Sequence, residues 1–146
     1  ELLIKTKKQW TSKDAGFHEY LITHKSWWDT VDFLSGHVVG NWFKLNPDQI
    51  KAVTGRWNRS ENIWLQRMSL LFQLKYKKET DLVLLTKYIL HLSKSKEFFV
   101  QKAIGWVLRE YSKTNPSWVK KFLKENELMP LSKREAMKVM ERKVGH

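Results

Sequence analysis

Hydrophobic residues recur at intervals of three and four along almost the whole of this chain of 146 residues. That spacing places apolar side chains on one face of an α-helix, whereas the strict alternation that is typical of strands does not occur. Only three prolines and six glycines interrupt the pattern. The sequence therefore predicts an all-α protein.

Turn and capping residues divide the pattern into helices of ordinary length. Pro47 and Pro116 each follow an asparagine and suit the first position of a helix. Ser60, Thr80 with Asp81, and a capping box formed by Ser132 and Glu135 mark further starts. After a first segment at 1–8, the expected helices cover residues 16–23, 26–35, 37–45, 47–57, 61–77, 80–93, 96–112, 116–126 and 132 onwards.

Short turns join these helices, and no linker or low-complexity tract separates them. We expect one domain over residues 1–146, built as an α-solenoid in which each helical hairpin buries its apolar face against its neighbours. Since no strict sequence repeat is present, a compact helical bundle is the alternative fold. A solenoid would present a concave basic face.

The surface is expected to be strongly basic, because 27 lysines and arginines stand against 15 acidic residues, a formal net charge of +12. Such a surface is typical of proteins that bind nucleic acid or anionic membranes. No apolar run approaches the roughly 20 residues that span a bilayer, and the start of the chain has no signal-peptide pattern. We expect a monomeric cytoplasmic protein that binds DNA or RNA and no membrane.

Cysteine is absent, which excludes disulfides, thiolate nucleophiles and cysteine-ligated zinc. The five histidines show no metal-binding spacing, so we expect no metal and no other cofactor. Eight tryptophans are many for this length. Tryptophan and arginine together hold bases, sugars and phosphates by stacking and charge.

An aspartate and a tryptophan share one face of the helix that Ser26 opens. Trp28 and Asp32 stand four residues apart, which places the indole one turn before the carboxylate. An aspartate near a helix start is more often a partner of the helix dipole than a catalyst. An acid beside an aromatic ring in so basic a protein is nevertheless a candidate for chemistry.

The helix expected at 96–112 carries apolar residues on both of its sides. Its core face is predicted to comprise Phe99, Val100, Ala103, Ile104, Val107, Leu108 and Tyr111. The opposite face gathers Phe98, Lys102, Gly105, Trp106 and Arg109. A purely solvated face would not carry two large aromatic residues, and the mid-helix glycine indicates close approach by another group. Either a ligand or a neighbouring helix would satisfy this pattern.

Arg67 projects from the apolar side of the helix expected at 61–77, whose polar stripe is Asn62, Gln66, Ser69 and Gln73. A guanidinium there must be paired or must reach into a cleft, because an unpaired buried charge is strongly unfavourable. Asp29 and Asp32 are the candidate partners. A structural ion pair is as good an explanation as a functional one. The C-terminal third adds many lysines and arginines that could contact phosphates, and the sequence does not discriminate among them.

Several of these residues fall in longer blocks, at 25–32 (KSWWDTVD), 62–67 (NIWLQR), 98–116 (FFVQKAIGWVLREYSKTNP) and 131–136 (LSKREA). In order and spacing the blocks resemble the AlkD family of DNA alkylation repair glycosylases, and the resemblance covers about residues 20–142. It implies a solenoid of HEAT-like antiparallel helical repeats with a concave basic groove for duplex DNA. Family members carry further helices upstream, so we expect this chain to be about the C-terminal two-thirds of a longer domain.

The family hydrolyses the N-glycosidic bond of N3- and N7-alkylated purines such as 3-methyladenine and 7-methylguanine. The resemblance makes Asp32 the catalytic aspartate, Trp28 and Trp106 its aromatic partners at the lesion, and Arg67 the lesion-side arginine. It places Lys75, Phe98, Phe99 and Arg109 along the DNA groove, and Lys102 shares a helix face with Arg109.

This assignment is chemically reasonable, because an alkylated purine is already cationic and leaves readily. A fixed carboxylate has to stabilise the oxocarbenium-like sugar and position water. We expect no deep nucleobase pocket. Two other classes use the same features: a non-catalytic helical-repeat protein that binds DNA, which would leave no abasic product, and a protein-binding scaffold, which would have no DNA affinity at moderate salt.

Overall fold

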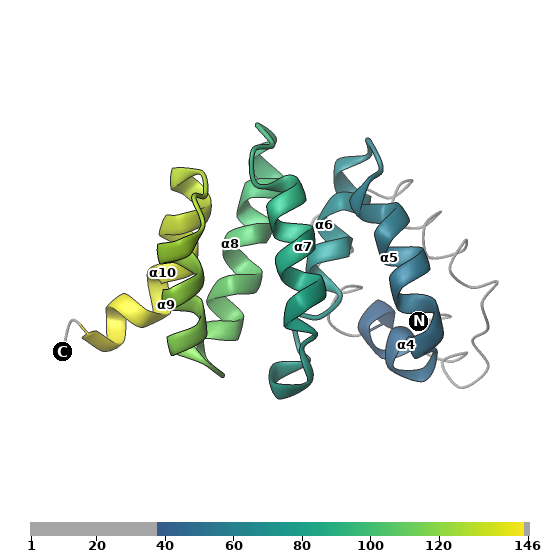
Figure 1. Ribbon diagram of the computed structural model, residues 1–146, viewed down its shortest axis with the longest axis horizontal. Helices are drawn as coiled ribbons and strands as arrows, with labels where there is room; N and C mark the ends of the chain where they lie inside the picture. The colour runs from purple at the N-terminus through teal and green to yellow at the C-terminus, as the bar shows by residue number, and fades with distance from the viewer. Residues whose placement is uncertain (1–37, 145–146) are drawn as a thin grey trace. The chain divides into compact units, whose positions relative to one another are not determined.

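The computed structural model describes residues 38–144, and the side chains of residues 38–140 (Figure 1). This part of the chain contains no strand, and the prediction of an all-α protein is confirmed. Its helices are α4 (Gly40–Leu45), α5 (Ile50–Asn58), α6 (Ile63–Leu71), α7 (Leu82–Leu92), α8 (Phe98–Ser112), α9 (Pro116–Glu125) and α10 (Pro130–Val144), with short 3₁₀ turns η3 (Pro47–Gln49) and η4 (Lys77–Glu79). None of these described helices is long and apolar enough to span a bilayer.

The chain divides into two compact units between Lys75 and Tyr76, and each is described by itself. The helices expected at 1–8, 16–23 and 26–35 lie outside the described residues. One domain over residues 1–146, and a solenoid of HEAT-like repeats, stay predictions.

An aromatic cluster forms the core of the first unit. The Phe43 ring lies edge-on to three others, with ring centroids at 5.0 Å from Trp42, 5.7 Å from Trp57 and 5.1 Å from Phe72. All four side chains are almost completely buried. Edge-to-face pairs of this kind stabilise a core beyond the area that they bury. Trp42 and Trp57 are therefore core residues, and the abundance of tryptophan is explained in part by packing rather than by binding.

Helix α6 is shorter than the periodicity predicts. Asn62 rather than Ser60 is the N-cap, and its side-chain oxygen accepts hydrogen bonds from the N–H groups of Trp64 (2.9 Å) and Leu65 (3.2 Å). The helix ends at Leu71 instead of Lys77. After Leu71 the α-helical pattern gives way to a tighter turn, in which the Leu74 N–H donates to the Leu71 carbonyl three residues earlier (2.9 Å). Part of the predicted polar stripe is buried, since the Asn58 side-chain amide at the end of α5 donates to the Ser69 hydroxyl (3.1 Å).

The two Asn-Pro pairs behave differently. Asn115 caps α9 as predicted, accepting a hydrogen bond from the Trp118 N–H (3.1 Å). Asn46 instead donates backwards to the Trp42 carbonyl (2.9 Å), so it closes α4 and does not cap the following turn. Pro47 opens the 3₁₀ turn η3, and α5 begins only at Ile50. The forward cap predicted at Asn46 is wrong because the side chain satisfies the preceding helix.

Helices α8 and α10 pack tightly against each other in the second unit. The contacts follow the same order along both helices: Ser132 of α10 contacts Gln101 of α8, and Glu135, one turn later in α10, contacts Gly105, one turn later in α8. The two helices therefore run in the same direction with α9 between them in the sequence. Alternate helices have this relationship in a stack of helical hairpins.

The predicted capping box at the start of the last helix is wrong. Helix α10 begins at Pro130, so Ser132 lies inside it. The Ser132 hydroxyl donates to the backbone carbonyl of Gln101 (2.9 Å) and also contacts the side-chain oxygen of Gln101. Glu135 turns toward α8 rather than back to the helix start. Pro130 supplies the helix start, since proline suits the first turn of a helix.

Candidate nucleic-acid interface

Helix α8 is packed against other parts of the protein on both of its sides. Its predicted core face is confirmed at Val100, Ala103, Ile104, Val107 and Leu108, which are buried, whereas Phe99 and Tyr111 at its edges are half-buried. On the opposite face Gly105 is also buried. A Cβ at Gly105 would lie 2.9 Å from the Ser132 carbonyl oxygen and would collide with the Cβ of Glu135. The group that approaches this glycine closely is therefore α10, a neighbouring helix and not a ligand.

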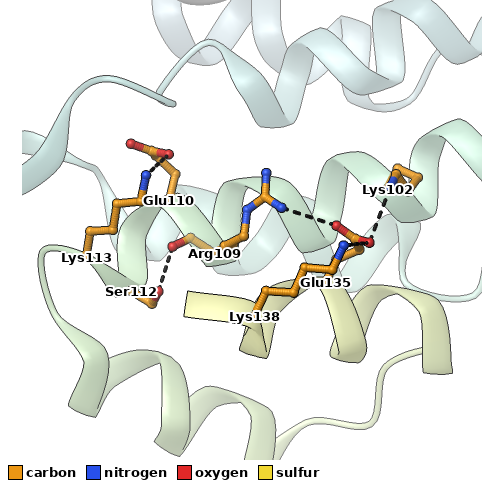
Figure 2. A network of polar contacts seen from close by, with 7 residues as sticks. All are labelled: Lys102, Arg109, Glu110, Ser112, Lys113, Glu135 and Lys138. Carbon is orange, nitrogen blue, oxygen red and sulfur yellow. Dashed lines mark hydrogen bonds and ion pairs between the residues drawn. The ribbon is translucent and has the colours of Figure 1, made fainter. Parts of the chain in front are cut away.

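Glu135 lies between two basic residues of α8 because of this contact. Lys102 and Arg109 stand three residues before and four residues after Gly105, on the same helix face. One carboxylate oxygen of Glu135 lies 3.3 Å from Lys102 Nζ and 2.7 Å from Lys138 Nζ, and the other lies 3.4 Å from Arg109 Nη1 (Figure 2). The Glu135 side chain is only 8% exposed, whereas Lys102, Arg109 and Lys138 are 36%, 28% and 46% exposed. We call Lys102, Arg109, Lys138 and Glu135 the α8–α10 cluster.

Glu135 is charged at neutral pH. Burial of its carboxylate raises the pKa, but hydrogen bonds from Lys138 and Lys102, together with their charges, outweigh burial and hold the pKa below its ordinary value. The α8–α10 cluster thus contains three cations and one anion, and its net charge is positive.

Two neighbouring aromatic residues begin α8. Phe98 is 55% exposed, an unusual exposure for a phenylalanine, and its ring lies edge-on to that of Phe99 with ring centroids 5.3 Å apart. The Lys102 Nζ lies 6.0 Å from the Phe98 ring centroid, at the limit of a cation–π contact. Phe98 and the α8–α10 cluster therefore share one surface, which combines an exposed ring with a surplus of positive charge.

Arg67 is fully buried in α6, as its place on the apolar side of the helix predicts. Its guanidinium carbon lies 5.9 Å from the ring centroid of Trp64. A charge this deep in a protein has to be compensated by partners. Asp29 and Asp32, the expected partners, lie outside the described residues.

Lys75 differs from its predicted setting. It was expected on the same helix as Arg67, but α6 ends at Leu71 and Lys75 is an exposed residue beyond it. The next residues form η4, where Lys77 adopts a left-handed backbone conformation with φ of 52°. The helical hydrogen-bond pattern of α6 has already ended before Lys75, at the hydrogen bond from the Leu74 N–H to the Leu71 carbonyl.

The remaining predicted site residues are Trp28, Asp32 and Trp106. Trp106 is half-buried on α8, one residue after Gly105. Trp28 and Asp32 lie outside the described residues, and Arg67 and Trp106 belong to different units. Convergence of these four side chains on one surface stays a prediction. No group of three or more potential metal ligands occurs within residues 38–140.

Sequence reasoning missed the part that Glu135 plays. A glutamate three residues after a serine resembles a capping box, and this pattern predicted that Glu135 would bond to the start of its own helix. The informative signal was the pair of basic residues that flank Gly105 on one face of α8, which leaves a space for an acidic side chain of another helix. Lys138, three residues after Glu135, is one of several C-terminal lysines among which the sequence did not identify a phosphate contact.

Comparisons with known proteins place these features in a family. The model of a family described as DNA alkylation repair enzyme matches residues 1–140. A solved structure, described as a predicted DNA alkylation repair enzyme from Enterococcus faecalis, is similar to this chain with 36% sequence identity and a TM-score of 0.86. The similarity covers 94% of this chain and 64% of that one, so this chain spans somewhat less than two thirds of its relative. A search of the curated proteins finds no match.

The family match extends over nearly the whole chain, and the solved relative has the same helical fold. On this evidence the chain belongs to the DNA alkylation repair enzyme family.

Proposed function

We propose that the protein is a DNA glycosylase that hydrolyses the N-glycosidic bond of cationic N3- and N7-alkylated purines in duplex DNA. The family match over residues 1–140 carries this proposal, because it includes the block with Trp28 and Asp32 as well as those with Arg67 and Trp106. The basic surface of α8 and α10 supports duplex DNA as the partner, since lysine and arginine neutralise backbone phosphates.

The chemistry assigns a role to each residue. The alkylated base is a cation and leaves without protonation, so the barrier lies in forming a positively charged sugar. A fixed carboxylate at Asp32 stabilises that charge and positions the attacking water. The indole faces of Trp28 and Trp106 favour the cationic sugar and base. Arg67 has no protonation role in this scheme, because a guanidinium keeps its proton, and it acts by orienting groups around the lesion.

Hydrolysis by water implies a monofunctional glycosylase, which releases the free base and leaves an abasic site without cutting the strand. The scheme requires no metal or other cofactor. We propose that the protein acts as a monomer.

Release of 7-methylguanine from methylated duplex DNA tests the proposal. The full chain is expected to release the base, and Asp32→Asn is expected to lose at least about a hundredfold in single-turnover rate, the usual effect of removing one group that stabilises transition-state charge. Asp48→Asn is the control, because Asp48 is an exposed residue of η3 whose carboxylate accepts a hydrogen bond from the side-chain amide of the neighbouring Gln49 (3.2 Å).

The outcomes separate the candidate functions. Equal activity of the wild type and Asp32→Asn would remove Asp32 from the mechanism. Salt-sensitive binding of duplex DNA without any abasic product would identify a non-catalytic DNA-binding protein instead.

A further inference from the structure

We propose that Glu135 is a positioning residue that holds Lys102, Arg109 and Lys138 together as one binding site for the phosphate backbone of DNA. The inference rests on the proposed function, since it assumes that this protein binds duplex DNA. It also selects Lys138 from the basic residues of the last helix as a phosphate contact.

The first observation is the depth of Glu135 compared with its partners. The carboxylate is nearly buried, at 8% exposure, while the three cations around it are 28–46% exposed. The anion therefore lies beneath the cations. A negative charge in that position attracts three side chains to one place and is itself shielded from a ligand at the surface.

The second observation is the number of donors compared with acceptors. Two carboxylate oxygens accept from three cationic groups, and each lysine ammonium has three donors while the guanidinium has five. Within residues 38–140, Glu135 is the carboxylate paired with each of these three cations. Donors and about two units of positive charge therefore stay available to an anion. A cluster that served only to join α8 to α10 would need no excess of cations.

The third observation is the rigidity of the support. Glu135 is fixed by the close contact of α10 with Gly105, and Ser132, one turn earlier, is held by Gln101 of α8. Lys102 is restrained on two sides, by Glu135 at 3.3 Å and by the Phe98 ring at 6.0 Å. Long basic side chains lose rotamer freedom on binding, and a side chain that is already restrained loses less. Without the carboxylate, the three cations would repel one another and separate.

Substitution of Glu135 by Gln distinguishes the effect of positioning on DNA affinity from the effect of net charge, because the two effects have opposite signs. Glu135→Gln makes a basic surface more positive by one unit, so a purely electrostatic effect would tighten DNA binding. Loss of positioning predicts the opposite result, a dissociation constant about fivefold higher, as expected for a free-energy loss near that of one ordinary ion pair. Glu110→Gln is the matched control, because it removes the same charge from α8, the helix of Lys102 and Arg109, and because Glu110 pairs with Lys113 at 3.1 Å, outside the cluster (Figure 2).

The probe is an undamaged, fluorescein-labelled duplex, titrated with the full chain at several salt concentrations. We expect weaker binding by Glu135→Gln and no weakening by Glu110→Gln. Lys138→Gln is expected to lower the slope of log K against log salt by about 0.9, the value for one phosphate contact. Single-turnover release of 7-methylguanine is measured over a range of protein concentrations, and the half-saturating concentration is expected to rise for Glu135→Gln and Lys138→Gln but not for Glu110→Gln, because a positioning residue for the backbone acts on binding.

Several results would overturn the inference. Binding by Glu135→Gln that equals or exceeds that of Glu110→Gln, with active wild type, refutes the positioning role and leaves the proposed function intact. A wild type that neither binds the duplex nor releases the base refutes both. Thermal unfolding of each variant shows whether it is folded. If Glu135→Gln is not folded, Lys138→Gln decides, and an unchanged affinity and salt slope for that variant refutes the site.

Discussion

Gly105 of α8 leaves a space that the Glu135 side chain of α10 occupies. A Cβ at Gly105 would collide with the Cβ of Glu135 and would lie 2.9 Å from the Ser132 carbonyl oxygen. Both groups are at or next to the backbone of a helix, so neither can rotate away. A close approach of α8 to α10 thus coincides with the centre of the α8–α10 cluster, and both the packing of the two helices and the charge of the cluster depend on Glu135.

Gly105→Ala is expected to destabilise the protein. At an unobstructed helix position alanine would stabilise by about 1 kcal/mol relative to glycine. Here overpacking costs about 1–3 kcal/mol, because α10 must shift. After subtraction of the gain in helix propensity, we expect a net loss of up to about 2 kcal/mol in the free energy of unfolding, measured by urea denaturation. An alanine variant that is more stable than the wild type would show that the two helices are not in close contact.

The glycine also shows how far the sequence could predict this structure. Helical periodicity was sufficient for the fold class and for the core face of α8, because burial repeats along the chain itself. The close approach at Gly105 was predictable as well. The group that approaches Gly105 was not predictable, since the spacing of residues within α8 contains no information about which distant helix packs against it. The same limit applies to Ser132 and Glu135, whose partners lie in α8. Ser132 and Gln101, for example, are 31 residues apart in the sequence.

Local signals failed where two local partners compete for the same side chain. Asn46 can cap the turn that follows it or close the helix before it, and the structure shows the second. Arg67 was predictable as a buried cation from its position among apolar residues, because the wheel alone determines its side of the helix. The wheel does not show which acidic side chains compensate the charge, so Asp29 and Asp32 could only be proposed as partners.

Gln101→Leu is expected to destabilise the protein strongly. The buried side-chain amide of Gln101 donates to the backbone carbonyls of Ser93 (3.3 Å) and Ser95, and its oxygen contacts the Ser132 hydroxyl. Leucine fills similar volume but leaves the carbonyls of Ser93 and Ser95 without this donor, at about 1–3 kcal/mol each, whereas the Ser132 hydroxyl keeps its hydrogen bond to the backbone carbonyl of residue 101. We expect a loss of about 3 kcal/mol in chemical denaturation. Gln49→Leu is the control, because the Gln49 side chain makes an exposed hydrogen bond to Asp48, and a change within about 0.5 kcal/mol is expected there.

Stability should fall in acid partly through Glu135. Its pKa is lower in the folded protein than its ordinary value of 4.5, so the charged form favours folding. This contribution is fully present above about pH 4.5 and is lost as the pH falls below that value through the lower folded pKa. The melting temperature of the wild type should therefore decrease more between pH 6 and pH 3 than that of Glu135→Gln. Parallel melting curves for the two proteins would contradict the lowered pKa.

The two Asn-Pro pairs predict unequal effects of alanine. Asn115 satisfies a free N–H at the start of α9, and Asn115→Ala is expected to cost about 1 kcal/mol, the usual value of an N-cap. Asn46 makes one part-buried hydrogen bond to the Trp42 carbonyl and caps no following helix, so Asn46→Ala is expected to cost about 0.5 kcal/mol. Equilibrium denaturation of both variants measures the difference. A larger loss for Asn46→Ala would mean that the forward cap exists after all.

Trp106 and Trp118 provide a matched pair of half-buried tryptophans in the second unit. Trp118 is stacked on Phe122 with ring centroids 5.1 Å apart and lies edge-on to Tyr111 at 5.6 Å, so its contacts are with its own helix and with α8. Trp118→Ala is expected to lower the free energy of unfolding by about 2 kcal/mol, in line with a partly buried aromatic residue. The activity of the folded fraction should be unchanged.

Trp106→Ala is expected to give the reverse result. We propose that the Trp106 indole faces the cationic lesion, and such a contact is worth about 1–2 kcal/mol, or roughly tenfold in rate. The single-turnover release of 7-methylguanine should therefore fall about tenfold, while the free energy of unfolding changes less than in Trp118→Ala. Since both variants remove the same side chain from the same unit, a rate that falls equally in both would indicate loss of structure. It would remove Trp106 from the proposed site.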